Sequence, residues 1–230
     1  MNDDVVGLLR NVSIFKGVAD PVLQRMAGRL RRRTFRRGEV IFHRGDPAGA
    51  LHVIRSGKVK IHMPSEEGEE TVLTLFGAGD CIGDFAALDG GARSATATAV
   101  EPTETLWMLR EDLLNGVREE PDLALAIILE LVAHLRRTNG WLEDAQSLDL
   151  DARFARRLLE LADAHGHPTP EGIEVPWPLT QTDLAGMLGV TRVSINRLLG
   201  TYQDEGLLRL NKGSITILRP DALRGRAGLS

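Results

Sequence analysis

Apolar residues follow a helical period through the middle of the chain. Between residues 121 and 144 they recur at steps of three and four, which places them on one stripe of an α-helix. The stripe consists of Leu125, Ile128, Val132, Leu135 and Leu142. Asn139 falls on the same stripe, with Thr138 beside it, so one polar level interrupts it. We expect this helix to pack against a partner helix, with Asn139 either fixing the register of the pair or contacting a ligand across a dimer.

Short strands are predicted before this helix. Residues 35–63 alternate between apolar and polar positions, are punctuated by glycines, and resume the same pattern at residues 71–76 and 104–109. This arrangement is typical of an antiparallel barrel or roll. Two short helical pieces precede it, and Asp20 followed by Pro21 predicts that Asp20 is the N-cap of the second.

Helices return after the long helix, and one pair of them has a specific spacing. A helix capped by Asp149 and ended by Gly166 is followed by a proline-rich loop with one short strand. Thr180, with Asp183 three residues later, predicts a capping box, and Thr191 predicts the start of a second helix. This spacing indicates a helix-turn-helix. A hairpin that turns at residues 211–213 adds a wing.

The second helix of this motif has a polar outer face. Its apolar residues pack internally, which leaves four side chains among the outward positions: Arg192, Ser194, Asn196 and Arg197. In a helix-turn-helix such a face enters the major groove of DNA, and Lys212 in the wing is then a candidate phosphate contact. The alternative is a plain helical hairpin with a charged face in solvent.

The charge balance is slightly acidic. The 230 residues carry a formal charge of −4, so a nucleic-acid contact must come from a local patch. Cys81 is the only cysteine, which excludes an internal disulfide and a four-thiolate metal site. We therefore expect no haem and no iron–sulfur cluster. The acidic amino terminus is unlike a signal peptide, and no apolar run approaches 18 residues. We expect a cytoplasmic protein without a membrane partner.

A metal-dependent enzyme on a cupin-like roll is the second class of function. It needs clustered histidine and carboxylate ligands on neighbouring strands. His43, His52 and His62 lack the usual His-x-His pairing, so we interpret them as half-buried strand residues. No nucleophile has a base at a useful spacing. We expect no metal and no enzymatic activity.

Residues 77–100 combine glycines with one acid and one Arg-Ser pair. Gly83 permits close approach of the backbone, while Arg93 and Ser94 supply a planar fork and a hydroxyl for an anion. Asp84 is suited to accept a hydrogen bond from a sugar hydroxyl. The segment is therefore a candidate phosphate cradle. Ordinary glycine-rich turns with a solvated arginine account for the same residues equally well.

Two of these segments resemble the CRP/FNR family of bacterial transcription regulators. Residues 35–61 are similar to its glycine-punctuated roll, and residues 83–95 resemble its phosphate-binding cassette. The likeness extends over essentially the whole chain. It implies a cyclic nucleotide, with Arg93 and Ser94 on the cyclic phosphate. It also implies that Asp84 and the backbone near Gly83 and Phe85 hold the ribose, and that Thr138 and Asn139 meet the base, one contact coming from each subunit.

Two residues depart from the family pattern. Asp84 stands where glutamate is usual, and its shorter side chain leaves cAMP affinity open. The effector is therefore cAMP, another cyclic mononucleotide, a cyclic dinucleotide, or none. Val193 stands where many members have a glutamate that accepts from a cytosine amino group, so we expect an operator that differs from the common one.

The sequence thus predicts an allosteric, homodimeric transcription regulator of the α+β class. Its parts are an antiparallel β-roll like a cyclic-nucleotide-binding domain (residues 1–119), a dimerisation helix (120–146) and a winged helix-turn-helix domain (147–230). The two-fold symmetry of such a dimer predicts a palindromic DNA operator. The resemblance implies RNA polymerase as a further partner, and activation and repression both stay open. The candidate DNA contacts are Thr180, Gln181, Thr191, Arg192, Val193, Ser194, Asn196, Arg197 and Lys212.

Overall fold

The chain folds into two compact units, residues 1–136 and 137–230, which are described separately. The structure is a computed structural model that describes residues 2–64, 70–176, 178 and 180–229. Within the described residues, no helix combines the length and the apolar character needed to span a membrane.

The first unit begins with three short helical elements, α1 (Asn2–Leu9), η1 (Ser13–Phe15) and α2 (Asp20–Ala27). The predicted N-cap at Asp20 is wrong. Asp20 is the first residue of α2, and its carboxylate accepts hydrogen bonds from the Arg10 guanidinium at 3.0 and 2.6 Å. An ion pair with Arg10, the residue directly after α1, therefore replaces the local cap.

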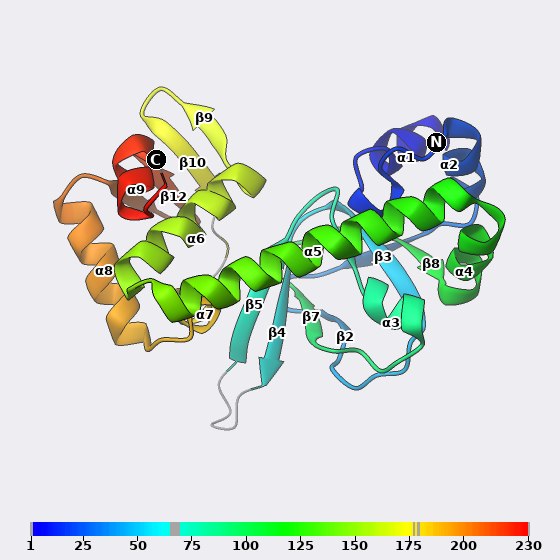
Figure 1. Cartoon of the computed structure of the whole chain (residues 1–230), viewed down its shortest axis with the longest axis horizontal. Coiled ribbons are helices and arrows are strands. Elements are labelled where there is room, and N and C mark those ends of the chain that lie inside the picture. Colours follow the sequence, from blue (N-terminus) through cyan, green and yellow to red (C-terminus); the bar gives the residue numbers. More distant parts are fainter. Residues whose placement is uncertain (1, 65–69, 177, 179, 230) are drawn as a thin grey trace. The chain divides into compact units, whose positions relative to one another are not determined.

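The described residues of the first unit form a roll of eight strands, and every pairing among them is antiparallel. One sheet has the strand order β1-β8-β3-β6 and the other the order β2-β7-β4-β5. The strands are β1 (Arg31–Phe35), β2 (Val40–Phe42), β3 (Ala50–Ser56), β4 (Val59–Pro64), β5 (Glu70–Phe76), β6 (Cys81–Ile82), β7 (Thr96–Ala99) and β8 (Thr103–Leu109). The predicted antiparallel roll is confirmed (Figure 1).

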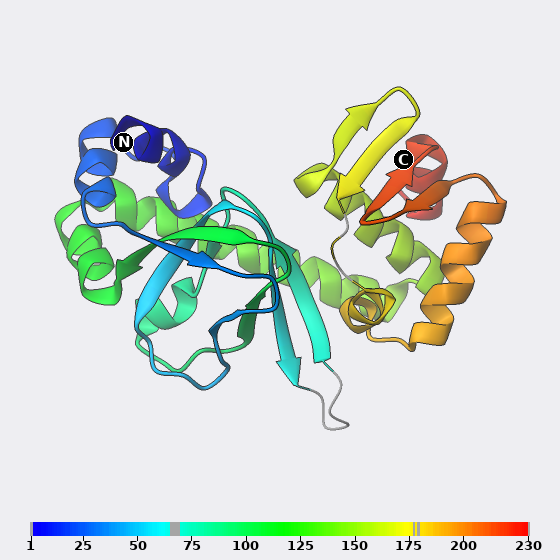
Figure 2. The ribbon, with the colours of Figure 1, turned by 180° about the vertical axis from the view of Figure 1, so that it is seen from behind.

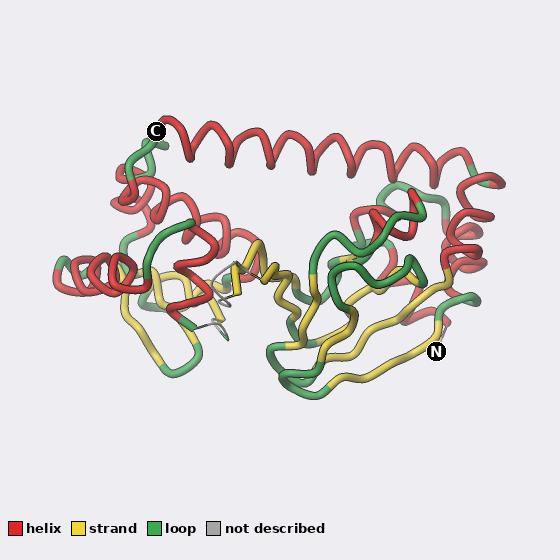
Figure 3. The backbone as a smooth tube through the Cα atoms, turned by 90° about the horizontal axis from the view of Figure 1, so that it is seen from below, coloured by secondary structure: helices red, strands yellow, loops and turns green. Residues whose placement is uncertain are grey.

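The two sheets pack against each other through one apolar cluster. Phe35 and Ile54 come from the first sheet, while Val59 and Ala97 come from the second, and all four are buried. Figure 3 shows the strands of this unit as one block with helices at its sides. Because strand side chains alternate between faces, this inner layer accounts for the alternating sequence pattern.

Three helices accompany and follow the strands of the first unit. α3 (Asp84–Asp89) lies between β6 and β7, α4 (Arg110–Glu119) follows β8, and α5 (Pro121–Ser147) comes next. Leu123, Ala126 and Ile127 anchor the first turns of α5 in a core shared with α1, α2 and α4. The sequence pattern predicted the long helix but neither α3 nor α4 as separate helices.

The described residues of the second unit form the end of α5, four further helices and one sheet (Figure 2). The helices are α6 (Leu150–His165), α7 (Gln181–Leu188), α8 (Arg192–Asp204) and α9 (Pro220–Arg226). The sheet has the order β11-β12-β10-β9, formed by β9 (His167–Thr169), β10 (Gly172–Pro176), β11 (Leu208–Asn211) and β12 (Ser214–Ile217). The proline-rich segment thus contains two strands rather than the one predicted.

The end of α5 is attached to α6 by polar and aromatic contacts. The Trp141 indole donates to Glu160 at 3.1 Å, and the Arg157 guanidinium lies 4.9 Å from the centre of its ring. Asp144 pairs with Arg156 one turn further along α5. These contacts hold the end of α5 against α6 within the second unit.

Buried His52 gives the roll a predicted sensitivity to acid. Its Nδ1 lies 3.1 Å from Thr105 Oγ1, and burial, helped by the charges of Arg93 and Arg33, lowers the pKa of the ring to about 3. The unfolded chain takes up this proton below pH 6.5 and the folded chain does not. We therefore expect the free energy of unfolding to fall as the pH drops from 6.5 towards 3, by up to a few kcal/mol.

Urea unfolding at pH 7 and pH 5 checks this expectation. In His52→Gln the free energy of unfolding should change less between pH 7 and pH 5, because glutamine does not titrate and can still reach Thr105. His43→Gln, which changes an exposed loop histidine, is the matched control. An equal loss of stability with pH in wild type and His52→Gln would contradict the assignment.

Candidate ligand pocket and nucleic-acid interface

A left-handed glycine begins the candidate cradle. Gly83, directly after β6, has φ 76° and precedes the first turn of α3. A side chain there would be strained, and a Cβ would lie 2.2 Å from Nη1 of Arg93. Both the backbone angle and the approach of Arg93 therefore require glycine at this position.

Arg93 is the buried cation of the cradle. Its side chain is 6% exposed, Nη1 donates to the Gly83 carbonyl at 2.8 Å, and Nη2 donates to the Ala50 carbonyl at 2.5 Å. Its Nε–H is buried without a hydrogen-bond partner. Burial lowers the pKa of Arg93, partly offset by Asp46 and Asp84. The guanidinium thus retains an unused donor in a partly dry place, the arrangement that a charge-assisted bond to an anion requires.

Asp84 and Phe85 follow Gly83 on the first turn of α3. Burial raises the pKa of the Asp84 carboxyl, while the backbone N–H groups of Asp84 and Phe85 favour its charged form. Phe85 is exposed, and its ring lies 5.1 Å from that of His134 on α5. Ser94 is exposed directly after Arg93. The structure therefore brings Gly83, Asp84 and Arg93 together, with Phe85 and Ser94 beside them.

The remaining predicted ligand contacts lie on α5. Thr138 and Asn139 are exposed residues of the second unit. Their contact with a base in the pocket stays a prediction. Sequence reasoning missed three groups around the cradle, namely the Ala50 carbonyl, Phe42 and His134. Each reaches the cradle from an element distant in sequence, so no local spacing identified it.

The apolar stripe of α5 is exposed. Each of its predicted members is more than 40% accessible: Leu125, Ile128, Val132, Leu135 and Leu142. Isolated exposed leucines are common, but a row of them along one helix, here interrupted at Asn139, is typical of an interaction surface.

The helix-turn-helix forms as its sequence predicts. Thr180 and Asp183 make the capping box, with the Asp183 N–H donating to Thr180 Oγ1 at 3.1 Å, and Gly189 ends α7 with φ 66°. Thr191 caps α8 by accepting from the Ser194 N–H at 3.2 Å. The Ser194 side chain also bonds to Thr191 at 3.0 Å, so it stabilises the helix start as well as lying near the outer face.

The outer face of α8 carries exposed cations. Arg192, Asn196 and Arg197 are exposed, and Val193 is 69% exposed. Within the described part of the chain, neither Arg192 nor Arg197 makes an ion pair or a side-chain hydrogen bond. Lys212 is exposed in the turn between β11 and β12, beside Gly213 with φ 84°. The helix and the wing therefore present positive charge that is available to phosphate oxygens or base edges.

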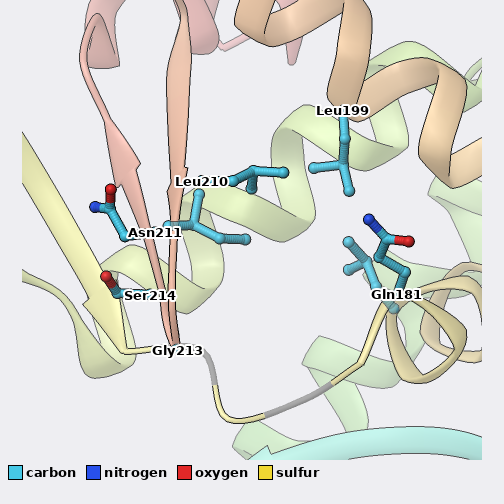
Figure 4. A pocket seen from close by; sticks show the side chains of 8 residues that line it. Gln181, Leu199, Leu210, Asn211, Gly213 and Ser214 are labelled. Atoms are coloured by element: carbon cyan, nitrogen blue, oxygen red, sulfur yellow. The ribbon is translucent and has the colours of Figure 1, made fainter.

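A small cavity of about 160 Å³ lies between α7, α8 and the wing (Figure 4). The side chains of Gln181, Leu199 and Leu210 face one another across it. Gln181, a predicted DNA contact, is half-buried and lines this cavity at the start of α7.

The strand histidines form no metal centre. His52 and His62 are buried and bond to Thr105 and Thr98, whereas His43 lies in an exposed loop rather than half-buried in a strand. Among the described residues, no group of three or more His, Cys, Asp or Glu side chains is placed to hold a metal. The ligand set that a cupin-like enzyme needs is missing from that part of the chain.

Two family models match the chain in succession. Residues 32–120 match the cyclic nucleotide-binding domain, and residues 152–226 match the Crp-like helix-turn-helix domain. The first match contains the cradle and the second contains α7, α8 and the wing.

Similar proteins share nearly the full length of the chain. The CRP-like cAMP-activated global transcriptional regulator of Mycobacterium tuberculosis is 31% identical over 220 residues, covering 96% of this chain and 98% of that protein. The global nitrogen regulator of Synechocystis sp. is 31% identical over 192 residues, covering 83% and 85%. The solved structure of a CRP-family transcriptional regulator from Thermus thermophilus matches with a TM-score of 0.72 at 26% identity, covering 86% of this chain and 97% of that one.

Proposed function

The chain belongs to the CRP/FNR family of transcription regulators, and from this premise we propose that it is a homodimer whose DNA binding is controlled by a cyclic nucleotide. The effector is cAMP or a close relative. The protein acts in the cytoplasm on a palindromic operator and contacts RNA polymerase there.

The observation that carries this proposal is the environment of Arg93. A buried guanidinium with an unused Nε–H lies against Gly83, where a side chain would exclude it. A cyclic phosphate supplies the negative charge and acceptor oxygens that such a group lacks. In this proposal Ser94 adds a hydroxyl to the phosphate site, and Asp84 accepts a hydrogen bond from a ribose hydroxyl. Thr138 and Asn139 then meet the base.

Regulation follows from differential affinity. A ligand controls DNA binding only if it binds more tightly to the conformer whose two recognition helices match the operator. The exposed stripe of α5 is the surface through which two chains pair in this proposal. The two-fold axis of the dimer then places two copies of α8 on half-sites about one helical turn apart, roughly 34 Å.

Asn139→Leu is predicted to separate dimerisation from ligand response. The substitution makes the stripe continuous and should tighten the dimer, since polar seam residues lower stability in exchange for specificity. It also removes a proposed base contact. Sedimentation equilibrium and nucleotide titration of the variant measure the two effects. If the Asn139→Leu protein responded to ligand as wild type does, Asn139 would only set the register of the helix pair.

Val193→Glu is predicted to change the operator. Val193 offers only an apolar contact, such as one to a thymine methyl, whereas glutamate accepts from the cytosine amino group. Selection of binding sites from random DNA at one salt concentration should therefore yield different preferred sequences for the two proteins. Arg192→Ala is the companion variant. Loss of a bidentate guanine contact should relax preference at one base pair per half-site by about 1 to 3 kcal/mol.

Lys212→Ala is the control for these selections. Because Lys212 is proposed to contact a phosphate, its loss should weaken binding to all DNA sequences alike and leave the preferred sequence unchanged. If wild type and Val193→Glu selected the same sequence, α8 would not be the element that reads base edges.

Calorimetric titration with cAMP, cGMP and cyclic dinucleotides tests the effector directly. The cAMP-activated relative supports cAMP, while the likeness to a global nitrogen regulator, over 192 rather than 220 residues, keeps another effector, or none, as the alternative. Substitution of Asp84 gives a second test of which ligand binds. If the ligand is cAMP, Asp84→Glu should hold or improve its affinity, and a clear loss would indicate another ligand.

A further inference from the structure

Phe42, at the end of β2, lies against Arg93, and we propose that it is the positioning residue for the ligand phosphate. Its ring packs on the face of the guanidinium, with no carboxylate of the described residues in contact, and leaves the Nε–H without a hydrogen-bond partner. The inference rests on the proposed function, because it concerns how the same pocket keeps its anion-binding group ready.

The contact is short and buried. Cζ of Arg93 lies 4.2 Å from the centre of the Phe42 ring, the smallest of the five arginine–aromatic distances in the described residues. Arg93 is buried, while the other four arginines in these contacts are more exposed. Because a cation over a ring gains most where water is excluded, this contact is the strongest of the set on physical grounds.

The hydrogen-bond partners of Arg93 are also neutral, although Asp46 and Asp84 act on its charge from a greater distance. Two backbone carbonyls, of Gly83 and Ala50, accept from its terminal nitrogens. Throughout the part of the chain that the structure describes, no carboxylate lies within ion-pair distance of Arg93. A contacting carboxylate would neutralise the guanidinium and occupy the N–H groups that a phosphate needs. An aromatic ring stabilises the cation from its face and leaves the edges free.

Phe42 is itself supported by neighbouring rings. His52 lies 6.3 Å from Phe42 and 6.3 Å from Phe35, which forms part of the buried core. The His52 ring is tied to Thr105. The contacts among Phe35, His52 and Phe42 hold the Phe42 ring in the plane on which the Arg93 guanidinium stacks.

Substitutions separate the electrostatic contact from simple packing. Phe42→Leu keeps an apolar side chain and removes the ring, and we expect cAMP to bind about three- to thirty-fold more weakly. Phe42→Tyr keeps the ring and should stay within about threefold of wild type. Phe76→Leu is the matched control, since Phe76 packs partly buried against the same core as Phe42 and makes no ring contact with Arg93. Phe76→Leu should lower the melting temperature about as much as Phe42→Leu does, but it should bind cAMP as tightly as wild type.

Fluorinated phenylalanines at position 42 give a readout that packing alone would not move. Successive fluorine atoms reduce the negative charge on the ring face with little change in shape, so cAMP affinity should fall stepwise with fluorine number. The measurement uses calorimetry on the full chain, with the melting temperature of each variant recorded alongside.

The outcomes separate the positioning role of Phe42 from the proposed function of the pocket. Weaker binding by Phe42→Leu, retained binding by Phe42→Tyr and a graded fluorine series support the positioning role. Wild-type affinity in Phe42→Leu, or a flat fluorine series, would overturn that role while leaving the pocket intact. If wild type bound neither cAMP nor any other cyclic nucleotide, the proposed function would fail and the role of Phe42 with it.

Discussion

Arg93→Ala is expected to weaken cyclic nucleotide binding by about 2 to 5 kcal/mol, the cost of removing one partner of a buried charged contact. This corresponds to a loss of about thirty-fold to several thousand-fold. The physical reason is that a phosphate in this partly dry place would lose its only contacting cation among the described residues. Calorimetric titration of the full chain with cAMP measures the change.

Two further variants refine this result. Arg93→Lys keeps the charge but loses the planar fork, so it should bind with intermediate affinity. Arg44→Ala removes an exposed arginine near the same strands and should bind as wild type does. Because Arg93 also satisfies the carbonyls of Gly83 and Ala50, thermal unfolding of each variant must accompany the titration. Unchanged affinity in a folded Arg93→Ala protein would contradict the pocket assignment.

Charge placed in the stripe of α5 should have an equally large effect on assembly. Ile128→Glu combined with Leu135→Glu puts two carboxylates per subunit into an apolar contact, and each costs several kcal/mol to bury without a partner. We expect the dimer to separate into monomers. Binding to a palindromic site should then fall by orders of magnitude, since one half-site alone remains in contact.

Sedimentation velocity at micromolar concentration measures the assembly, and fluorescence anisotropy with labelled DNA measures the binding. Ala145→Glu is the control, because it adds a carboxylate at an exposed position of α5 outside the stripe. A dimer that survived both glutamates, with full affinity for DNA, would place the subunit contact elsewhere.

Local signals in the sequence predicted much of this fold. The capping box of Thr180 and Asp183, the N-caps Asp149 and Thr191, and the wing turn at Gly213 each depend on residues close in sequence. The antiparallel roll followed from alternation, and the long helix from its apolar period. The caps and the wing turn depend on residues a few positions apart, whereas the strand pairs of the roll, such as β1 with β8, join distant segments.

Features that depend on distant partners were missed. Asp20 was expected to cap α2, but its carboxylate accepts a hydrogen bond from the Arg10 guanidinium instead. The helices α3 and α4 were not expected as separate helices, and α4 packs Leu113 into a core shared with α1 and α2. In the pocket, Arg93 was recognisable from its neighbours in sequence, whereas Phe42 and the Ala50 carbonyl come from β2 and β3. Only tertiary structure brings such groups together.

Ligand control of DNA binding is the central claim, and one measurement tests it most directly. The affinity of the wild-type protein for a palindromic site selected from random DNA is measured by fluorescence anisotropy, at one salt concentration, with and without saturating cyclic nucleotide. The account predicts that one nucleotide shifts this affinity at least about five-fold, corresponding to a coupling free energy of about 1 kcal/mol or more. An affinity that stayed the same with every nucleotide, although the nucleotide bound, would contradict it.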